Sequence, residues 1–274
     1  MTTNVPPPRP RTLTIAGSDS GGGAGIQADL KTFSALGVFG MTAITAVTVQ
    51  NTLGVTGYEA LSPAIVGDQI RSVVTDIGVD AAKTGMLANA GIVRAVAAAV
   101  AETRMPNLVV DPVFVSKHGH SLLDADAVGA LRSEILPLAT LVTPNLPEAA
   151  GLAGVGVATR REMREAADII LGLGASAVLV KGGHMERSEV AADLFVDATT
   201  AAWIEAPWID TPHTHGTGCT LSAAIAAFVA AGSELIDAVR EGKAFVTDAI
   251  RHALGLGGGI GPVDPIWETP APGG

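Results

Sequence analysis

The sequence predicts an α/β fold in which helices cover both faces of a mostly parallel sheet, a three-layer α/β/α sandwich. Short β-branched or aliphatic runs alternate with segments of helical periodicity along most of the chain. The runs are almost continuously apolar, which is typical of parallel strands buried on both faces. The chain has 274 residues, of which 48% are hydrophobic, so it can bury a large core.

The predicted elements follow one another in order along the chain. Strands are expected at 12–16, 41–49, 55–61, 81–86, 108–110, 140–142, 177–180, 194–196 and 203–205. Helices are expected at 25–36, around 70–77, and at 90–102, 125–136, 147–152, 160–173, 217–231 and 235–254. The strands at 194–196 and 203–205 flank a short turn and predict an antiparallel hairpin.

A single domain is expected over residues 12–266, because no long polar spacer divides the chain. The tails at 1–11 and 267–274 are rich in proline or glycine, and we expect them to be disordered or frayed.

Composition narrows the class of partner. The chain carries 27 acidic against 17 basic residues, which argues against nucleic acid or an anionic membrane as a partner. One cysteine cannot form an internal disulfide, and the start of the chain lacks the apolar core of a secretion signal, so we expect a cytoplasmic protein. Residues 32–58 and 216–233 are uncharged, but their glycines, threonines and alanines fit burial in a protein better than a membrane.

The segment from His215 to Thr220 places two glycines and the only cysteine where a loop becomes a helix. Free backbone N–H groups and the positive end of the helix dipole meet at such a point and favour an anion, typically phosphate. The same position is expected to lower the pKa of the Cys219 thiol. The alternative is an ordinary glycine-rich turn with a buried cysteine.

Polar residues follow almost every other predicted strand as well. In an open parallel sheet, ligands bind beyond the carboxyl ends of the strands, so these residues predict one binding rim. They are the glycine-rich run 17–25 with Asp29 behind it, Gln50 and Asn51, Asp111, residues 143–148 and residues 181–184.

Each of these features has an ordinary explanation when taken alone. The first glycine loop lacks the spacing of a dinucleotide fingerprint, and no loop ends as a Walker A motif does. Asp29 could interact only with the helix dipole, and Gln50 could bond to the backbone. Asn145 and Glu148 could simply cap a helix. His213 and His215 alternate as metal ligands can, but no third ligand lies near them in the sequence.

The combination of motifs resembles the ribokinase-like superfamily of kinases. It is more similar still to the hydroxymethylpyrimidine/phosphomethylpyrimidine kinase family of thiamine biosynthesis, with matching blocks in order from Thr12 to Pro262. The matching runs are 14–17, 25–33, 50–52, 143–149, 181–184 and 215–220. The resemblance implies an enzyme that uses ATP to phosphorylate 4-amino-5-hydroxymethyl-2-methylpyrimidine and then adds a second phosphate to the product. It also implies a homodimer, which the uncharged strands around 41–58 could form.

The resemblance assigns the pyrimidine to Gln50, which would recognise the aminopyrimidine edge, and to Gly17, Asp29, Met86 and Val113, which would line the same pocket. A carboxamide offers both a donor and an acceptor, which suits a ring that carries an amino group beside a nitrogen.

By the same resemblance, Asn145, Lys181 and Thr217 would bind the nucleotide, while Asp111 and Glu148 would bind Mg²⁺. Hard cations prefer oxygen ligands and neutralise the phosphoryl group in transfer.

The catalytic segment implied by the resemblance is Gly216, Thr217 and Gly218, as an anion hole, followed by Cys219. Sugar kinases of the superfamily usually carry an aspartate base at this cysteine position, so we expect Cys219 to act as a base or orienting group in its thiolate form. Two departures from the family pattern, Phe114 and the run 20–23, bear on the substrate pocket and leave the phosphate-handling residues unchanged.

Two other functions remain open at this point. One is a pyridoxal or pyridoxine kinase, or a kinase of both vitamin precursors, because such enzymes share the fold. The other is a non-catalytic protein that binds nucleotide or pyrimidine, which Asn145, Glu148 and the glycine loop disfavour, since a binder needs no arrangement for phosphoryl transfer.

Overall fold

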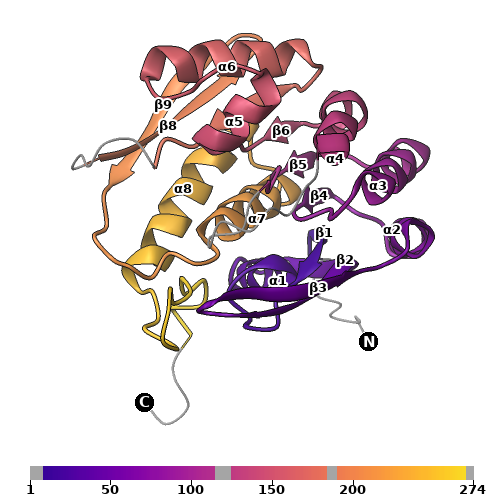
Figure 1. Ribbon diagram of the computed structural model, residues 1–274, viewed down its shortest axis with the longest axis horizontal. Coiled ribbons are helices and arrows are strands. Elements are labelled where there is room, and N and C mark those ends of the chain that lie inside the picture. The colour runs from indigo at the N-terminus through magenta and orange to yellow at the C-terminus, as the bar shows by residue number, and fades with distance from the viewer. Residues whose placement is uncertain (1–8, 115–124, 184–189, 270–274) are drawn as a thin grey trace, which may run out of the picture.

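A computed structural model of the chain describes residues 9–114, 125–183 and 190–269 (Figure 1). Residues 1–8 and 270–274, which are parts of the predicted tails, and His184 lie outside these residues. One nine-stranded sheet runs through the molecule in the order β3-β2-β1-β4-β5-β6-β7-β8-β9. Its strands are β1 Arg11–Ser18, β2 Phe39–Asn51, β3 Gly54–Ala60, β4 Ala81–Thr84, β5 Leu108–Val110, β6 Leu141–Val142, β7 Ala177–Val180, β8 Val190–Asp197 and β9 Ala201–Pro207.

The sheet is parallel in its middle and antiparallel at both ends. All neighbouring strands from β2 through β1, β4, β5 and β6 to β7 run parallel. The hairpin β2–β3 closes one edge, and β7, β8 and β9 pair antiparallel at the other. The predicted mostly parallel sheet and the hairpin near residues 194–205 are therefore confirmed.

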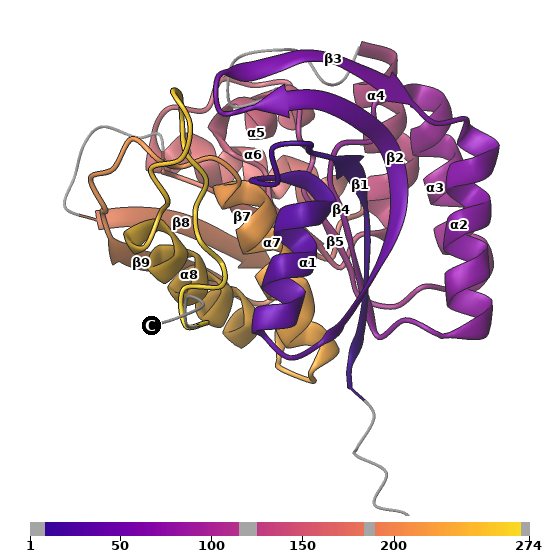
Figure 2. The same ribbon diagram turned by 90° about the horizontal axis from the view of Figure 1, so that it is seen from below.

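Helices cover both faces of this sheet (Figures 1 and 2). They are α1 Gly25–Ala35, α2 Pro63–Asp76, α3 Ala90–Thr103, α4 Ala125–Ala130, α5 Leu146–Ala153, α6 Arg160–Gly172, α7 Thr217–Ala230 and α8 Leu235–Arg251. On one face, Val66, Ile92 and Ile170 pack with the strands in a large apolar core. On the other, α7 and α8 pack through residues such as Ile225 and Val239. The predicted α/β/α sandwich is thus confirmed.

A side chain caps the start of α2, α3, α5 and α6, whereas α1, α7 and α8 begin without a side-chain cap. Ser62, Asn89 and Thr159 each accept a hydrogen bond from a backbone N–H in the first turn of α2, α3 and α6. The residue before α7 is Gly216, in the left-handed conformation with φ 83°, and no side chain caps the helix. Thr217 N donates to Thr214 O at 3.4 Å, and no side chain caps the other N–H groups of this turn, so these remain available to an anion such as phosphate.

The helix expected at 125–136 is less regular than predicted. It is α-helical as α4, then widens to a π-helical turn over Leu131–Ile135 and tightens to a 3-10 turn over Leu136–Leu138. Pro137 has no N–H to donate, so the α-helical ladder cannot continue through it.

Trp267, in the C-terminal segment that we expect to be frayed, stacks on His252 with ring centroids 5.9 Å apart.

Among the described residues, none of the helices combines the length and the apolar character needed to cross a lipid bilayer.

Candidate active site

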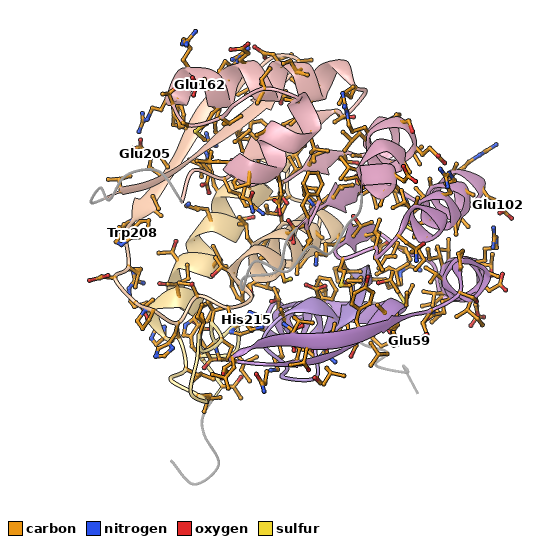
Figure 3. The ribbon with its side chains drawn as sticks, viewed as in Figure 1. Glu59, Glu102, Glu162, Glu205, Trp208 and His215 are labelled. Atoms are coloured by element: carbon orange, nitrogen blue, oxygen red, sulfur yellow. The ribbon has the colours of Figure 1, made fainter. Side chains whose placement is uncertain are left out.

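A cavity of about 800 Å³ lies at the carboxyl ends of the parallel strands, where the sequence predicts a rim. It is lined by all the predicted site residues except Asp29: Gly17, Gln50, Met86, Asp111, Val113, Asn145, Glu148, Lys181, Gly216, Thr217, Gly218 and Cys219. Segments from β1, β2, β4, β5 and β7 therefore meet the start of α7 around one space. Figure 3 shows His215, which also lines it, beside the β2–β3 hairpin and the C-terminal segment.

The first turn of α7 forms one wall of the cavity. Thr217 Oγ1 donates to Thr214 O at 2.8 Å, which fixes the approach to the helix. Gly216 lies against the first glycine loop so closely that a Cβ there would be 1.8 Å from Gly23 O. Only glycine fits both the contact and the left-handed backbone, so this residue sets the position of the N–H groups that follow it.

Lys181 lies between two carboxylates in the cavity wall. Its Nζ is 3.0 Å from Asp111 Oδ1 and 4.0 Å from Glu148 Oε2. Burial alone would lower the pKa of Lys181, but Asp111 and Glu148 outweigh it and raise that pKa. Burial raises the pKa of Glu148, as does the charge of Asp111 beside it. The cluster therefore combines a fixed cation with two acidic groups that face one point, a suitable arrangement for polyphosphate and its metal.

The capping role that the sequence left open for Asn145 and Glu148 is present. Asn145 Oδ1 accepts from Glu148 N at 2.9 Å, and Glu148 Oε2 accepts from Asn145 N at 2.8 Å. Both residues also line the cavity, so the capping box holds them at its wall. Capping and ligand binding are compatible here.

Cys219 is half-buried in the cavity wall, and the expected lowering of its pKa is wrong. Burial raises the pKa of the thiol to about 11, and the charges of Asp29 and Asp111 add to this, although Lys83 and a bond from Gly25 N oppose it. At neutral pH the group is therefore a thiol, because the penalty of enclosing a charge exceeds the effect of the helix terminus.

Asp29 lies beneath the cavity and does not line it. The side chain is fully buried, accepts a hydrogen bond from Thr14 Oγ1 at 2.6 Å, and forms an ion pair with Lys83 Nζ at 3.0 Å. Lys83 does line the cavity, and the sequence reading missed it. The sequence feature that could have indicated Lys83 is its position inside the apolar strand β4. A buried lysine needs an anionic partner, so a lysine at such a position suggests a buried ion pair.

His213 and His215 have separate structural roles. His215 Nε2 lies 3.0 Å from Asp19 Oδ2, whereas His213 Nδ1 accepts from Gly261 N at 3.0 Å. Among residues 9–114, 125–183 and 190–269, no three acidic, histidine or cysteine side chains are grouped to hold a metal. Asp19 and His215 are further residues of the cavity wall that the sequence reading did not assign.

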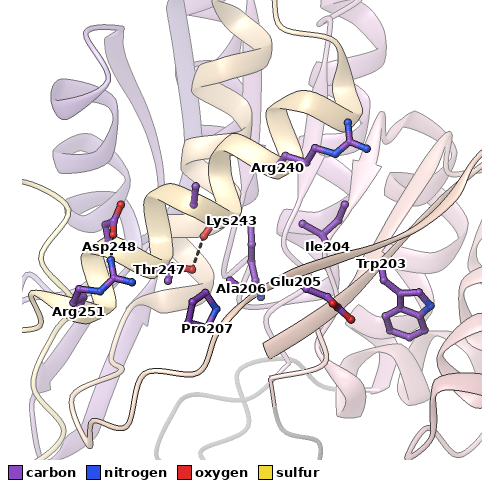
Figure 4. A pocket seen from close by; sticks show the side chains of 11 residues that line it. Trp203, Ile204, Glu205, Ala206, Pro207, Arg240, Lys243, Thr247, Asp248 and Arg251 are labelled. Atoms are coloured by element: carbon purple, nitrogen blue, oxygen red, sulfur yellow. Dashed lines mark hydrogen bonds and ion pairs between the residues drawn. The ribbon is translucent and has the colours of Figure 1, made fainter. Parts of the chain in front are cut away.

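A second hollow, of about 480 Å³, lies between β9 and α8 (Figure 4). Its cations already have acidic partners: Arg240 pairs with Asp237, Lys243 with Asp193 at 2.7 Å, and Arg251 with Asp248. With its charges neutralised, this surface gives an anionic ligand no unpaired cation to bind.

Fold and site together define a phosphotransferase of the ribokinase-like class: an open helix N-terminus, a lysine and two carboxylates meet at the carboxyl edge of a parallel sheet. The chain belongs to the phosphomethylpyrimidine kinase family, which it matches over residues 19–264.

Known relatives span almost the whole chain. A hydroxymethylpyrimidine/phosphomethylpyrimidine kinase from Streptomyces coelicolor is 52% identical over 97% of this chain and 98% of its own length. The thiamine biosynthesis bifunctional protein ThiED of Geobacter sulfurreducens is 48% identical over 96% of this chain and 53% of that protein. The crystal structure of Bacillus subtilis pyridoxal kinase as an ADP complex has a TM-score of 0.87 at 42% identity, covering 93% of this chain and 97% of that chain.

Proposed function

We propose that the protein uses ATP to phosphorylate the hydroxymethyl group of 4-amino-5-hydroxymethyl-2-methylpyrimidine, and then phosphorylates the resulting monophosphate to the diphosphate, for thiamine biosynthesis. The observation that carries this is that one cavity holds Gln50, a group able to read an aminopyrimidine edge, together with the uncapped start of α7. Family membership and the named relatives support the same reaction.

The transferring phosphate would lie at the first turn of α7. Backbone N–H groups there stabilise the charge that develops on the phosphoryl oxygens without having to reorganise. Lys181 would contact the polyphosphate, and Asn145 and Thr217 would bind the nucleotide, because all three line the cavity.

The oxygen donors of Asp111 and Glu148 fit Mg²⁺, because both carboxylates are buried at the cavity wall and both face Lys181. These two residues would hold the ion, and nucleotide phosphates and water would complete its coordination. When bound, Mg²⁺ neutralises and aligns the phosphates.

Gln50, Gly17, Met86 and Val113 would bind the pyrimidine, because they line the same cavity. Asp29 would act on this pocket from below by holding Lys83 in its wall.

Cys219 is expected to contribute little as a base, because a thiol whose pKa is about 11 stays protonated at neutral pH. A loose phosphoryl-transfer transition state also needs little base assistance. Replacing Cys219 with alanine should therefore lower kcat by less than about tenfold, and Cys219→Ser should behave similarly. Steady-state kinetics on both substrates test this. A loss of a hundredfold or more in kcat, in a variant that still folds, would instead support a role of Cys219 as a thiolate base.

The deciding experiment is an ATP-coupled assay with hydroxymethylpyrimidine in which the products are identified. We expect the monophosphate first and the diphosphate later. Failure to form the diphosphate would contradict the proposed second phosphorylation.

Pyridoxal kinase is the alternative, because a pyridoxal kinase shares the fold at 42% identity. A comparison of kcat/KM for pyridoxal and hydroxymethylpyrimidine separates the two functions, and a higher value for pyridoxal would favour the alternative. ATP consumption at background with either compound would favour a non-catalytic binder.

The assembly we propose is a homodimer through the β2–β3 hairpin. Several large apolar side chains of this edge are exposed: Phe39, Val47, Val49, Leu53 and Tyr58. An apolar sheet edge of this kind is a ready surface for a second copy. Sedimentation equilibrium should give a dimer for the native chain and a monomer for Val49→Asp.

Because the reaction draws on ATP, we also place the protein in the cytoplasm, which cell fractionation would test.

A further inference from the structure

The carboxylate of Asp19 closes the first glycine loop on itself. Its oxygen Oδ1 accepts from Gly21 N at 2.8 Å, and Oδ2 accepts from Gly23 N at 3.1 Å and from Ala24 N at 2.8 Å. Burial alone would raise the pKa of Asp19, but the bonds from His215 and from the loop backbone outweigh burial and lower that pKa. The loop is therefore folded around a buried negative charge.

The same carboxylate bonds to a residue 196 positions away in the sequence. His215 Nε2 lies 3.0 Å from Asp19 Oδ2, and both side chains are buried. Because a carboxylate has no hydrogen to give, the imidazole N–H donates this bond. The backbone of His215 is fixed by the C-terminal segment, since His215 N donates to Gly261 O at 3.1 Å and Val263 N donates to His215 O at 3.0 Å. The first glycine loop is thus bonded to a residue that is itself held in place.

The Asp19–His215 bond lies beside the first turn of α7. His215 directly precedes Gly216, whose backbone lies against Gly23 O, and a Cβ at Gly23 would be 2.5 Å from His215 Cδ2. His215 Nε2 is also 3.3 Å from Gln50 Nε2, an atom of the side chain that we assign to the pyrimidine. The bond is therefore located between the proposed pyrimidine-binding residue and the proposed anion hole.

We propose that Asp19 and His215 are positioning residues, whose hydrogen bond holds the first turn of α7 at the distance from the first glycine loop that phosphoryl transfer needs. This inference rests on the proposed function, in which Gly17 of that loop lines the pyrimidine pocket and the start of α7 holds the transferring phosphate. The two segments meet through glycines, which have no side chains to pack. A directed bond to a buried charge is the stronger kind of hydrogen bond and fixes their spacing instead.

The first test removes the donor at position 215 without changing the length of the side chain. His215→Met has no hydrogen to donate to Asp19, and we expect kcat at saturating substrates to fall about 10- to 100-fold, because small displacements of reacting groups are costly. His215→Gln places an amide N–H at a similar distance from the backbone and should restore kcat to within about threefold of the native value. Equal values of kcat for the two variants would overturn the proposal.

Asp19→Ala breaks the bond from its other side and leaves the His215 side chain beside Gln50. It should lower kcat at least as much as His215→Met does. Asp197→Ala is the matched control, because Asp197 also accepts backbone N–H groups of a turn, those of Thr199 and Thr200 at 2.7 Å, but does not line the cavity. The control should keep the native kcat. An equal loss in Asp197→Ala would attribute the effect to general loosening of the fold and contradict the proposal.

A double-variant comparison separates positioning from a merely structural role. Gly216→Ala already displaces the start of α7, so adding His215→Met to it should lower kcat by less than about twofold further. A variant that only reduces the folded fraction would lower kcat by the same factor in both backgrounds. The full loss in the Gly216→Ala background would therefore overturn the proposal.

A binding measurement needs no acceptor substrate. The terminal phosphate is the part of ATP that would contact the first turn of α7, so His215→Met should weaken binding of β,γ-methylene ATP about tenfold and leave the affinity for ADP unchanged. Calorimetric titration of both nucleotides measures this, with His215→Gln as the reference. Equal changes for the two nucleotides would reject the proposal. Because neither titration contains a pyrimidine, the result is independent of whether hydroxymethylpyrimidine is phosphorylated, and the two failures are distinguishable.

Discussion

Replacing Gly216 with alanine is expected to lower kcat by about 10²- to 10³-fold, the scale of losing a preorganised donor to a developing oxyanion. The added Cβ would lie 1.8 Å from Gly23 O, and φ at this residue is 83°. Either the first glycine loop or the start of α7 must move. In both cases the backbone N–H groups at the start of α7 would leave the position in which we propose that they face the transferring phosphate. Steady-state kinetics with saturating ATP measure the loss.

Gly232, at the other end of α7, provides the control. Its φ of 98° is also left-handed, but a Cβ there would meet nothing within 4 Å. Gly232→Ala therefore introduces the backbone strain without the clash. It should lower the stability of the fold by about 1 kcal/mol and leave kcat unchanged. Equal losses of kcat in the two variants would show that strain in α7, rather than displacement of the anion hole, lowers the rate.

The elements that could be predicted are those whose signals are local. The start of α7 is visible because a glycine-flanked turn precedes an apolar run, and the capping box joins Asn145 and Glu148, which are only three positions apart. The helix at 125–136 was predicted, but its π-helical turn over Leu131–Ile135 and the 3-10 turn over Leu136–Leu138 were not.

Site chemistry that depends on distant pairs could not be predicted. Asp19 and His215 are separated by 196 positions and Asp29 and Lys83 by 54, yet both pairs are in direct contact. The pKa of Cys219 was predicted in the wrong direction for the same reason. The helix terminus is visible in the sequence, whereas the enclosing walls and the charges of Asp29 and Asp111 come from other strands and helices.

Lys83→Met is expected to destabilise the fold by about 3–5 kcal/mol, the usual cost of leaving one member of a buried ion pair without its partner. Both side chains are fully buried, and Lys83 Nζ lies 3.1 and 3.0 Å from the two oxygens of Asp29. Burial alone would lower the pKa of Lys83, but Asp29 first, then Cys219 and Asp111, raise it, so the native lysine stays charged. Urea unfolding monitored by circular dichroism measures the loss.

The pH dependence of that loss identifies its cause. Burial raises the pKa of Asp29 while Lys83 opposes this, so in Lys83→Met the folded-state pKa of Asp29 rises further above its unfolded value. A carboxyl group of this kind destabilises the fold fully above its folded-state pKa, and the penalty shrinks as pH falls through that pKa. Lys83→Met should thus recover part of its stability as the pH falls from neutral through the raised folded-state pKa of Asp29. The double variant Asp29→Leu/Lys83→Met, which removes both charges of this pair, should be more stable than Lys83→Met at pH 7 and should lack this recovery. A double variant as unstable as Lys83→Met would instead attribute the loss to packing around the lysine side chain.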